Sequence, residues 1–298
     1  MTIWEYFEQF IFQKQLQGLS DFSIRSYRDH IGVFVKYIGE SSDLSDITLE
    51  KVNAYIFSLY NKKLAKATIA TYIRNLRIFL TWINTEYGGL PFEPKKIKIP
   101  KTPKKLVRIY TDEEIQYIFS LASVSVPWIT ARNRAIIALM LDSSMRQSEI
   151  CSLLKINVSF DTMSMKVTGK GAKDRFVPLG YISSTFLKDY LLQCPYKDVA
   201  YVFVNKLGKP LSCNAIKVFA NRLKHQLPFE FSSHKLRHNF ATNYCIDHIH
   251  DSGNTNVYDL SIIMGHESIE TTKKYEHFAH EMLALQNRIS HLDKVYKA

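Results

Sequence analysis

The sequence predicts a mainly α-helical protein of two domains: a helical bundle, then a mixed α/β domain with a small antiparallel sheet. The first observation is length, because 298 residues, 46% of them hydrophobic, suit two cores better than one. The second is apolar spacing of three and four residues along most of the chain, which is typical of helices. The third is a single stretch, residues 158–178, in which apolar and polar residues alternate.

Residues 1–93 are expected to form a bundle of four or five helices. Between residues 68 and 87 the apolar side chains recur at helical steps and form one stripe: Ile69, Tyr72, Ile73, Leu76, Leu80 and Ile83. Arg74 and Arg77 fall outside this stripe, so they are candidates for contacts with a partner. Residues 20–38 follow the same pattern, with Arg25 and Arg28 facing outward.

The excess of positive charge gathers between the two domains. The formal net charge is +11, yet residues 1–93 hold ten basic and ten acidic groups, and residues 94–110 hold seven basic groups and no acidic one. Because Pro94, Pro100 and Pro103 oppose a helix, we expect this basic segment to be extended. It suits a polyanion, with these lysines as candidate DNA contacts: Lys95, Lys96, Lys98, Lys101, Lys104 and Lys105. A solvated linker would have the same composition, which leaves both interpretations open.

Residues 111–298 are expected to form the second domain. Its first helix begins with a capping-box pattern at Thr111, and helical spacing runs through residues 111–123 and 130–142. Alternation at Met163, Met165 and Val167 predicts a strand. A glycine turn at residues 169–171 and an extended segment at residues 175–178 complete the small sheet.

Residues 212–226 are expected to form a helix with two chemically different sides. One side is apolar, and the other carries amides and amines: Asn214, Lys217, Asn221 and Lys224. Such groups on one helix face read base edges and contact phosphates in a DNA major groove. A solvated outer face would also be polar, so this alternative stays open.

Four separate segments carry the groups of a metal-free phosphoryl-transfer site. They are SSMRQSEI, GKGAKDR, HKLRHNFAT and GHESIETTKKY. Arginine and histidine donors can neutralise charge on non-bridging phosphate oxygens, and a lysine on a turn can protonate a leaving oxygen. A tyrosine can hold the phosphoryl group covalently, provided that its phenol, with a pKa near ~10, is activated. The residues concerned are Arg146, Lys170, His234, Arg237, His266 and Tyr275, with Glu149 placed three residues after the first arginine.

The order and spacing of these segments resemble the tyrosine recombinase (phage integrase) family, most closely its short Xer-like members. The resemblance covers nearly the whole chain, and it implies an N-terminal core-binding, SAM-like domain and a C-terminal catalytic domain. It also implies roles: Arg146 and Arg237 hold the scissile phosphate, and Lys170 is the general acid toward the 5′-hydroxyl. His234 acts as base or acid near the tyrosine, and His266 donates to the phosphate. Tyr275 attacks as the nucleophile, while Glu149 supports Arg146.

Two departures from the family pattern concern shape. Ser144 stands where the family usually has glycine, so the turn before Arg146 is expected to differ. Residues 245–260 look like a loop a few residues longer than in short members.

Other side chains receive a structural interpretation. His238 is expected to be a buried structural histidine. Cys245, His248 and His250 lack the spacing of a zinc site, and no paired carboxylates accompany the motifs. We therefore expect no metal and no cofactor. The first residues do not resemble a signal peptide, and the four cysteines lie far apart with no paired spacing. We therefore expect a cytoplasmic protein with no membrane segment.

The sequence thus predicts a site-specific recombinase that closes two domains around duplex DNA as a C-shaped clamp. Past Tyr275 the apolar residues Phe278, Met282, Leu285, Ile289 and Leu292 recur at steps of four and three. The resemblance implies a tetramer on DNA, in which this tail docks on a neighbouring subunit, and it allows a partner recombinase. Packing on its own domain is the alternative for the tail. A non-catalytic DNA-binding protein and a type IB topoisomerase are the alternatives for the function.

Overall fold

The computed structural model describes residues 1–101, 108–169, 171, 173–286 and 295. The chain divides into two compact units, Met1–Lys105 and Leu106–Ala298. Of the predicted DNA contacts, Lys104 and Lys105 lie outside the described residues, as does the predicted general acid Lys170.

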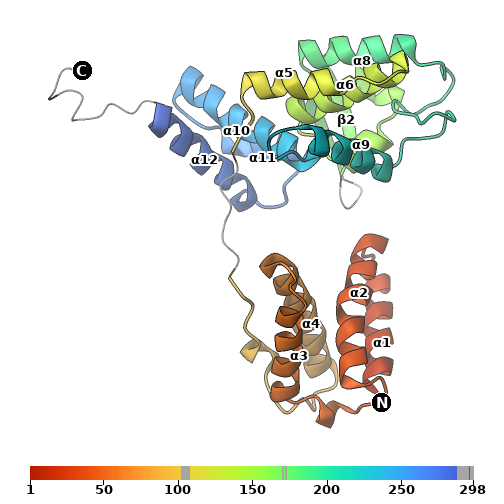
Figure 1. Ribbon diagram of the computed structural model, residues 1–298, viewed down its shortest axis with the longest axis vertical. Helices are drawn as coiled ribbons and strands as arrows, with labels where there is room; N and C mark the ends of the chain where they lie inside the picture. Colours follow the sequence, from red (N-terminus) through yellow and green to blue (C-terminus); the bar gives the residue numbers. More distant parts are fainter. Residues whose placement is uncertain (102–107, 170, 172, 287–294, 296–298) are drawn as a thin grey trace. The chain divides into compact units, whose positions relative to one another are not determined.

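The first unit is a bundle of helices, as predicted. Residues 1–93, all of which the structure describes, form four α-helices: α1 (Ile3–Leu16), α2 (Asp21–Ile38), α3 (Leu49–Asn61) and α4 (Lys66–Glu86). Figure 1 shows them as the red to orange part of the ribbon. Their apolar stripes meet in one core, where Phe10 packs edge-on against Phe79 with ring centroids 5.3 Å apart.

The basic segment begins on the surface of this unit. Pro94 and Ile97 are buried against its core, and Pro94–Lys96 form one 3-10 turn. The expectation of a fully extended segment is therefore wrong for these residues, because a proline fits the first position of a turn, where its missing N–H is not needed. The turn holds Lys95 and Lys96 on the outside, and Lys98 and Lys101 are exposed as well.

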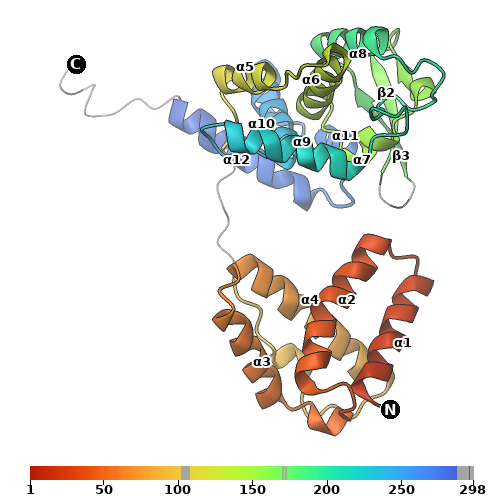
Figure 2. The ribbon, with the colours of Figure 1, turned by 45° about the vertical axis from the view of Figure 1, so that its right-hand side comes forward.

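The second unit combines helices with a three-stranded sheet. Its strands β1 (Val158–Ser159), β2 (Ser164–Thr168) and β3 (Asp174–Pro178) pair antiparallel in sequence order. Met165 and Val177 face each other across β2 and β3 and are buried. Figure 2 shows β2 and β3 at one edge of the unit. Its helices are α5 (Asp112–Leu121), α6 (Pro127–Asp142), α7 (Gln147–Ser152), α8 (Tyr181–Gln193), α9 (Cys213–Gln226), α10 (Ser233–Ser252), α11 (Val257–Met264) and α12 (Glu270–Gln286).

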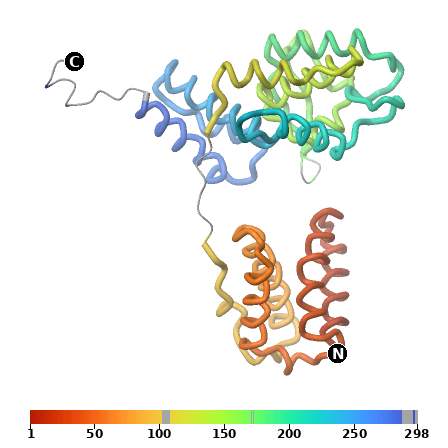
Figure 3. Tube along the Cα trace, in the orientation of Figure 1, coloured from red at the N-terminus to blue at the C-terminus, as the bar shows by residue number. Residues whose placement is uncertain are grey.

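Helices α10 and α12 run side by side, which brings the HKLRHNFAT segment to the tyrosine segment (Figures 1 and 3). The predicted loop at residues 245–260 is largely wrong. Helix α10 continues to Ser252 because Ile246 and Ile249 pack into the core between these helices. It ends at Gly253, whose φ of +73° suits glycine. Only residues 253–256 separate α10 from α11.

The turn before Arg146 has a backbone conformation that glycine adopts easily. Ser144 has a φ of +54°, in the left-handed region that side chains with a Cβ seldom adopt. It is fully buried, and its carbonyl oxygen accepts a hydrogen bond from Arg237. The turn thus keeps a glycine-like backbone shape although serine occupies it.

The tail after Tyr275 continues as helix α12. Ala279 and Leu283 are buried on their own unit, and Phe278 is half-buried against it. Leu285, in contrast, is 72% exposed. Ile289 and Leu292, the rest of the predicted apolar seam, lie outside the described residues. Within the part of the chain that the structure describes, no helix is long and apolar enough to span a membrane.

Candidate functional site

A single buried carboxylate organises the arginines of the site. Glu149, on α7, is 1% exposed and accepts hydrogen bonds from the side chains of Arg146 and Arg175 and from the backbone N–H of Arg146. The two bonds from Arg175 are 2.7 and 2.9 Å long, so this pair is bidentate. Burial alone would raise the pKa of Glu149, but these donors outweigh it and hold the pKa below its usual range.

Three guanidinium groups meet the C-terminal end of α11. The carbonyl oxygens of residues 263, 264 and 265 accept, in that order, from Arg175, Arg237 and Arg146 at 2.7, 2.6 and 3.0 Å. A helix C-terminus carries partial negative charge, so cations are stabilised there. Gly265 turns the chain with a φ of +61°, and a Cβ at this position would lie 3.1 Å from the Arg175 side chain. The arginines therefore position the backbone that leads to His266.

Tyr275 lies inside this arrangement, surrounded by imidazoles. It is 1% exposed, and its hydroxyl oxygen is 2.6 Å from Nδ1 of His238. The ring of His266 is nearly parallel to the tyrosine ring, with centroids 6.4 Å apart, and its Nδ1 is 2.8 Å from Oγ1 of Thr272. His234 stands edge-on to His238, with centroids 4.3 Å apart.

Burial sets the protonation of these groups. It raises the pKa of Tyr275 to about 12, although Arg237 and Arg146 nearby oppose the shift. Burial and the surrounding cationic groups lower the pKa of His238 to about 3 and that of His266 to about 4. At neutral pH the phenol thus keeps its proton, and uncharged His238 can accept a hydrogen bond from it.

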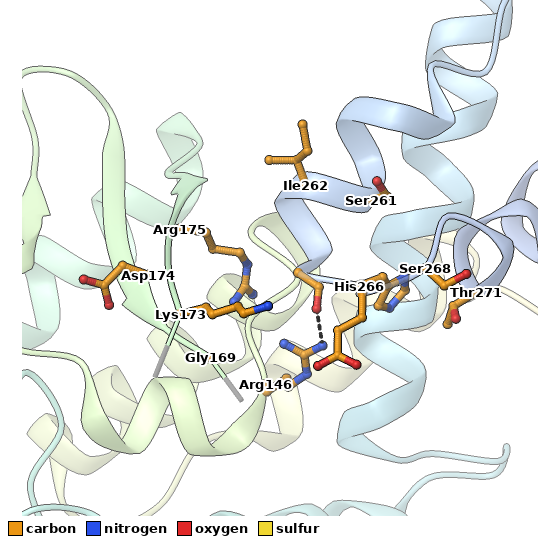
Figure 4. A pocket seen from close by; sticks show the side chains of 12 residues that line it. Arg146, Gly169, Lys173, Asp174, Arg175, Ser261, Ile262, His266, Ser268 and Thr271 are labelled. Atoms are coloured by element: carbon orange, nitrogen blue, oxygen red, sulfur yellow. Dashed lines mark hydrogen bonds between the residues drawn. The ribbon is translucent and has the colours of Figure 1, made fainter. Parts of the chain in front are cut away.

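A cavity of 650 Å³ reaches two of the predicted site residues, Arg146 and His266 (Figure 4). Arg175 and Lys173 contribute from the side of the sheet, and the Lys173 side chain extends into the space between Arg175 and His266. Tyr275 is not among the lining residues, which agrees with its burial.

The structure brings together five of the six residues that the sequence indicated. Arg146 precedes α7, His234 and Arg237 lie on α10, His266 follows α11, and Tyr275 lies on α12. The sixth, Lys170, lies outside the described residues.

Two further residues were missed as neighbours of the site. His238, expected to be a buried structural histidine, is half-buried, and its ring nitrogen contacts the Tyr275 hydroxyl. Its position one helical turn after His234, on the same face, was a usable signal. Arg175 was also missed, although a charged residue two positions before buried Val177 must point to the interior side of its strand.

Cys245 and His248, on α10, contact other protein groups. Cys245 is fully buried, and burial raises the pKa of its thiol to about 12. Nδ1 of His248 is 2.9 Å from the Tyr244 carbonyl oxygen. Among the described residues, no three His, Cys, Asp or Glu side chains are grouped as metal ligands would be.

Comparison with known proteins decides the family. The model of the phage integrase family matches residues 108–282, and that of the SAM-like N-terminal domain of phage integrases matches residues 4–86. The chain belongs to the phage integrase family. The resemblance drawn from the motifs and the predicted fold class are thereby confirmed, and the chain is a site-specific tyrosine recombinase.

Similar proteins support this membership. The chain is 26% identical over 292 residues to tyrosine recombinase XerC of Oceanobacillus iheyensis, with 93% of each covered. It is 32% identical to tyrosine recombinase XerC of Lacticaseibacillus casei, covering 82% of this chain and 83% of the relative. The structure of the Tn1549 transposon integrase with transposon right end DNA shares the fold, with a TM-score of 0.74 and 14% identity. That comparison covers 96% of this chain and 99% of the other.

The predicted DNA-contacting residues of this integrase-family chain are largely on the surface. On α9 all four polar residues of the predicted face are exposed: Asn214, Lys217, Asn221 and Lys224. On α4, Arg74 is exposed and Arg77 is half-buried. Their contact with DNA remains a prediction.

We predict that Glu149→Gln strongly destabilises the second unit. The change leaves Arg146 and Arg175 without their counter-charge, and removing one partner of a buried ion pair costs about 3–5 kcal/mol. Because the pKa of Glu149 is lowered in the folded state, its contribution is present above the unfolded pKa and is lost as pH falls through the folded value. Urea unfolding at pH 7 and along an acid series measures both effects.

The matched control is Glu267→Gln, which changes an exposed acid in the same cavity. We expect its urea midpoint to equal that of the unaltered protein. A Glu149→Gln protein as stable as this control at pH 7 would contradict the role given to the carboxylate.

Proposed function

We propose that this chain cleaves and rejoins duplex DNA through a 3′-phosphotyrosine at Tyr275, without a metal ion. The observation that carries the proposal is the environment of the tyrosine. Its hydroxyl contacts His238, its ring stacks near His266, and the guanidiniums of Arg146 and Arg237 lie close enough to oppose its raised pKa. The two guanidinium groups supply the positive charge that phosphoryl transfer requires.

In the proposed cleavage step the phenolic oxygen of Tyr275 attacks phosphorus, and the bond from phosphorus to the 5′-oxygen breaks. The phenolic proton passes to the histidines beside it: Nδ1 of His238 lies at the hydroxyl, and His234, edge-on to His238, is the base that the family resemblance implies. The 5′-oxygen leaves as a hydroxyl after taking a proton from Lys170, the acid that the family resemblance implies. Because the bond energy stays in the phosphotyrosine, another 5′-hydroxyl can reverse the step and join a new strand.

DNA binding must rearrange the site before this step can occur. Tyr275 and Arg237 are 1% and 3% exposed, so a duplex cannot reach either of them in the form described above. Arg146 and Arg237 donate to carbonyl oxygens of residues 265 and 264, and a phosphate would take over some of these bonds. We therefore propose that the segment from α11 to α12 shifts when the scissile phosphate enters.

The wider DNA contact is proposed to involve both units. The described lysines of the basic segment, from Lys95 to Lys101, and Arg74 are exposed on the first unit, and α9 exposes its amides and amines on the second. We propose that the two units clamp one duplex. Phosphate contacts would then supply affinity, and α9 would read the bases. A double-stranded recombination site is accordingly the proposed partner.

Assembly into a tetramer on DNA is proposed to use the end of α12. Joining two duplexes requires four strand cleavages and therefore four copies of the site. Leu283 is 8% exposed and anchors the helix to its own unit, whereas Leu285 is 72% exposed and available to a neighbour. A head-to-tail contact through this leucine could close into a ring.

Tyr275→Phe tests the proposed nucleophile. The change removes one oxygen and little volume, so DNA binding should stay within about twofold while the SDS-stable adduct with DNA disappears. Tyr258→Phe, at an exposed position on α11, is the matched control and should form the adduct normally. If Tyr275→Phe still forms the SDS-stable complex, the nucleophile is another residue.

Leu285→Glu tests the assembly. A carboxylate at an apolar contact is costly, so cooperative binding to a two-half-site DNA should weaken by about tenfold or more, equivalent to ~1.4 kcal/mol. Binding to a single half-site should not change, and recombination should fall with the cooperativity. Leu192→Glu, at a leucine that is 79% exposed on α8, is the control. Normal recombination by Leu285→Glu would show that this leucine joins no neighbour.

A further inference from the structure

A basic hollow on α9 lies apart from the site described above. It is a cavity of 270 Å³ between α9, α6 and the turn that joins α5 to α6. Three cationic side chains line it: Arg132, Lys206 and Arg222. The remaining lining residues, all within the described ranges, are apolar or neutral, so no carboxylate balances this charge inside the hollow.

The two arginines of this hollow are fixed by aromatic rings and left with unused donors. The guanidinium carbon of Arg222 is 5.5 Å from the ring centroid of Phe219, and that of Arg132 is 5.6 Å from Trp128. Nε and one terminal nitrogen of Arg222 are buried without a hydrogen-bond partner in the described part of the chain. Nε of Arg132 is likewise buried without a hydrogen-bond partner in the described part of the chain, although NH1 of the same side chain donates to the Val204 carbonyl at 2.8 Å.

Guanidinium N–H groups that lack an acceptor within the described part of the chain favour an anionic ligand. A charged group withdrawn from water is costly unless it is paired, and most buried polar atoms in folded proteins have partners. Stacking holds a guanidinium plane in place and leaves its edge for the ligand. A planar fork of N–H groups matches two oxygens of a phosphate or carboxylate. The chemistry of the hollow therefore fits an oxyanion.

The position of the hollow on α9 selects DNA phosphate as that oxyanion. On its other flank α9 borders a second hollow, of 230 Å³, which includes Lys217, Lys224, Ser232 and Ser233. Asn214 and Asn221 are exposed on the same helix, and Asn221 also lines this second hollow. A helix in a major groove, which is about 12 Å wide, has a sugar-phosphate backbone on each side. Cationic hollows on two flanks of one helix suit contacts to both backbones of such a groove.

We propose that Arg222, Lys206 and Arg132 hold a backbone phosphate of the strand opposite the one that the Lys217 flank contacts. The inference rests on the proposed function, in which α9 enters the major groove. Arg222 and Lys206 thus anchor the helix against sliding within the groove, and the base-reading residues keep one register. The contact carries no sequence preference of its own, because a phosphate is the same at every base pair.

The test measures binding of Arg222→Gln to a duplex half-site and to a random duplex over a series of salt concentrations. Losing one phosphate contact should reduce the slope of log K against log salt by about 0.9. Affinity at about 0.1 M salt should fall roughly tenfold for both duplexes, which corresponds to ~1.4 kcal/mol, as expected for a charged hydrogen bond. Arg222→Lys keeps the charge and should restore the slope.

Lys206→Gln is a second variant of the hollow that leaves α9 unchanged. The matched control is Lys188→Gln, which changes an exposed lysine on α8 and should leave the salt slope unaltered. Circular dichroism and thermal unfolding verify that each variant is folded. If wild-type binding depends on salt and both hollow variants keep the wild-type slope of log K against log salt, the proposed phosphate contact is wrong. A defect confined to two-half-site DNA would also overturn it and would point to an acidic side chain of a neighbouring subunit. Failure of the wild-type protein to bind any duplex would instead refute the proposed function.

Discussion

The arrangement of the second unit depends on the carboxylate of Glu149. One negative charge, 1% exposed, holds Arg146, which precedes α7, and Arg175, on strand β3. Both arginines also donate to the end of α11, so the carboxylate indirectly fixes the helix that precedes His266. Without it, guanidiniums of like charge would be buried close together, which a protein interior does not tolerate. A site rich in cations can therefore fold before DNA arrives.

The same packing that builds the site also closes it. Tyr275 is among the largest fully buried side chains, and burial raises its pKa to about 12. A phenol with that pKa does not attack a phosphodiester at neutral pH. The carbonyl oxygens of residues 264 and 265 occupy donors of Arg237 and Arg146, in the way that phosphate oxygens would. We propose that exchange of these acceptors on DNA binding couples substrate entry to the release of the tyrosine segment.

Much of this could be predicted from the sequence, because helical spacing and a glycine turn are local signals. The stripe on α4, the small sheet and the gathering of Arg146, His266 and Tyr275 followed from such signals and from motif order. What could not be predicted depends on partners far along the chain. The contact of His238 with Tyr275 depends on α12 lying beside α10. The length of α10 depends on the packing of Ile249 in the core between these helices. The hollow on the flank of α9 likewise combines residues from three separate segments.

We propose that Tyr275 forms the covalent bond to DNA without a metal ion. The most direct measurement is mass spectrometry of the proteolysed adduct, trapped on nicked duplex DNA in buffer with EDTA. We expect a nucleotide joined through its 3′-phosphate to the peptide that carries Tyr275, and a free 5′-hydroxyl on the other DNA end. An adduct on any other residue, a 5′-phosphate attachment, or cleavage that appears only after magnesium is restored would contradict it.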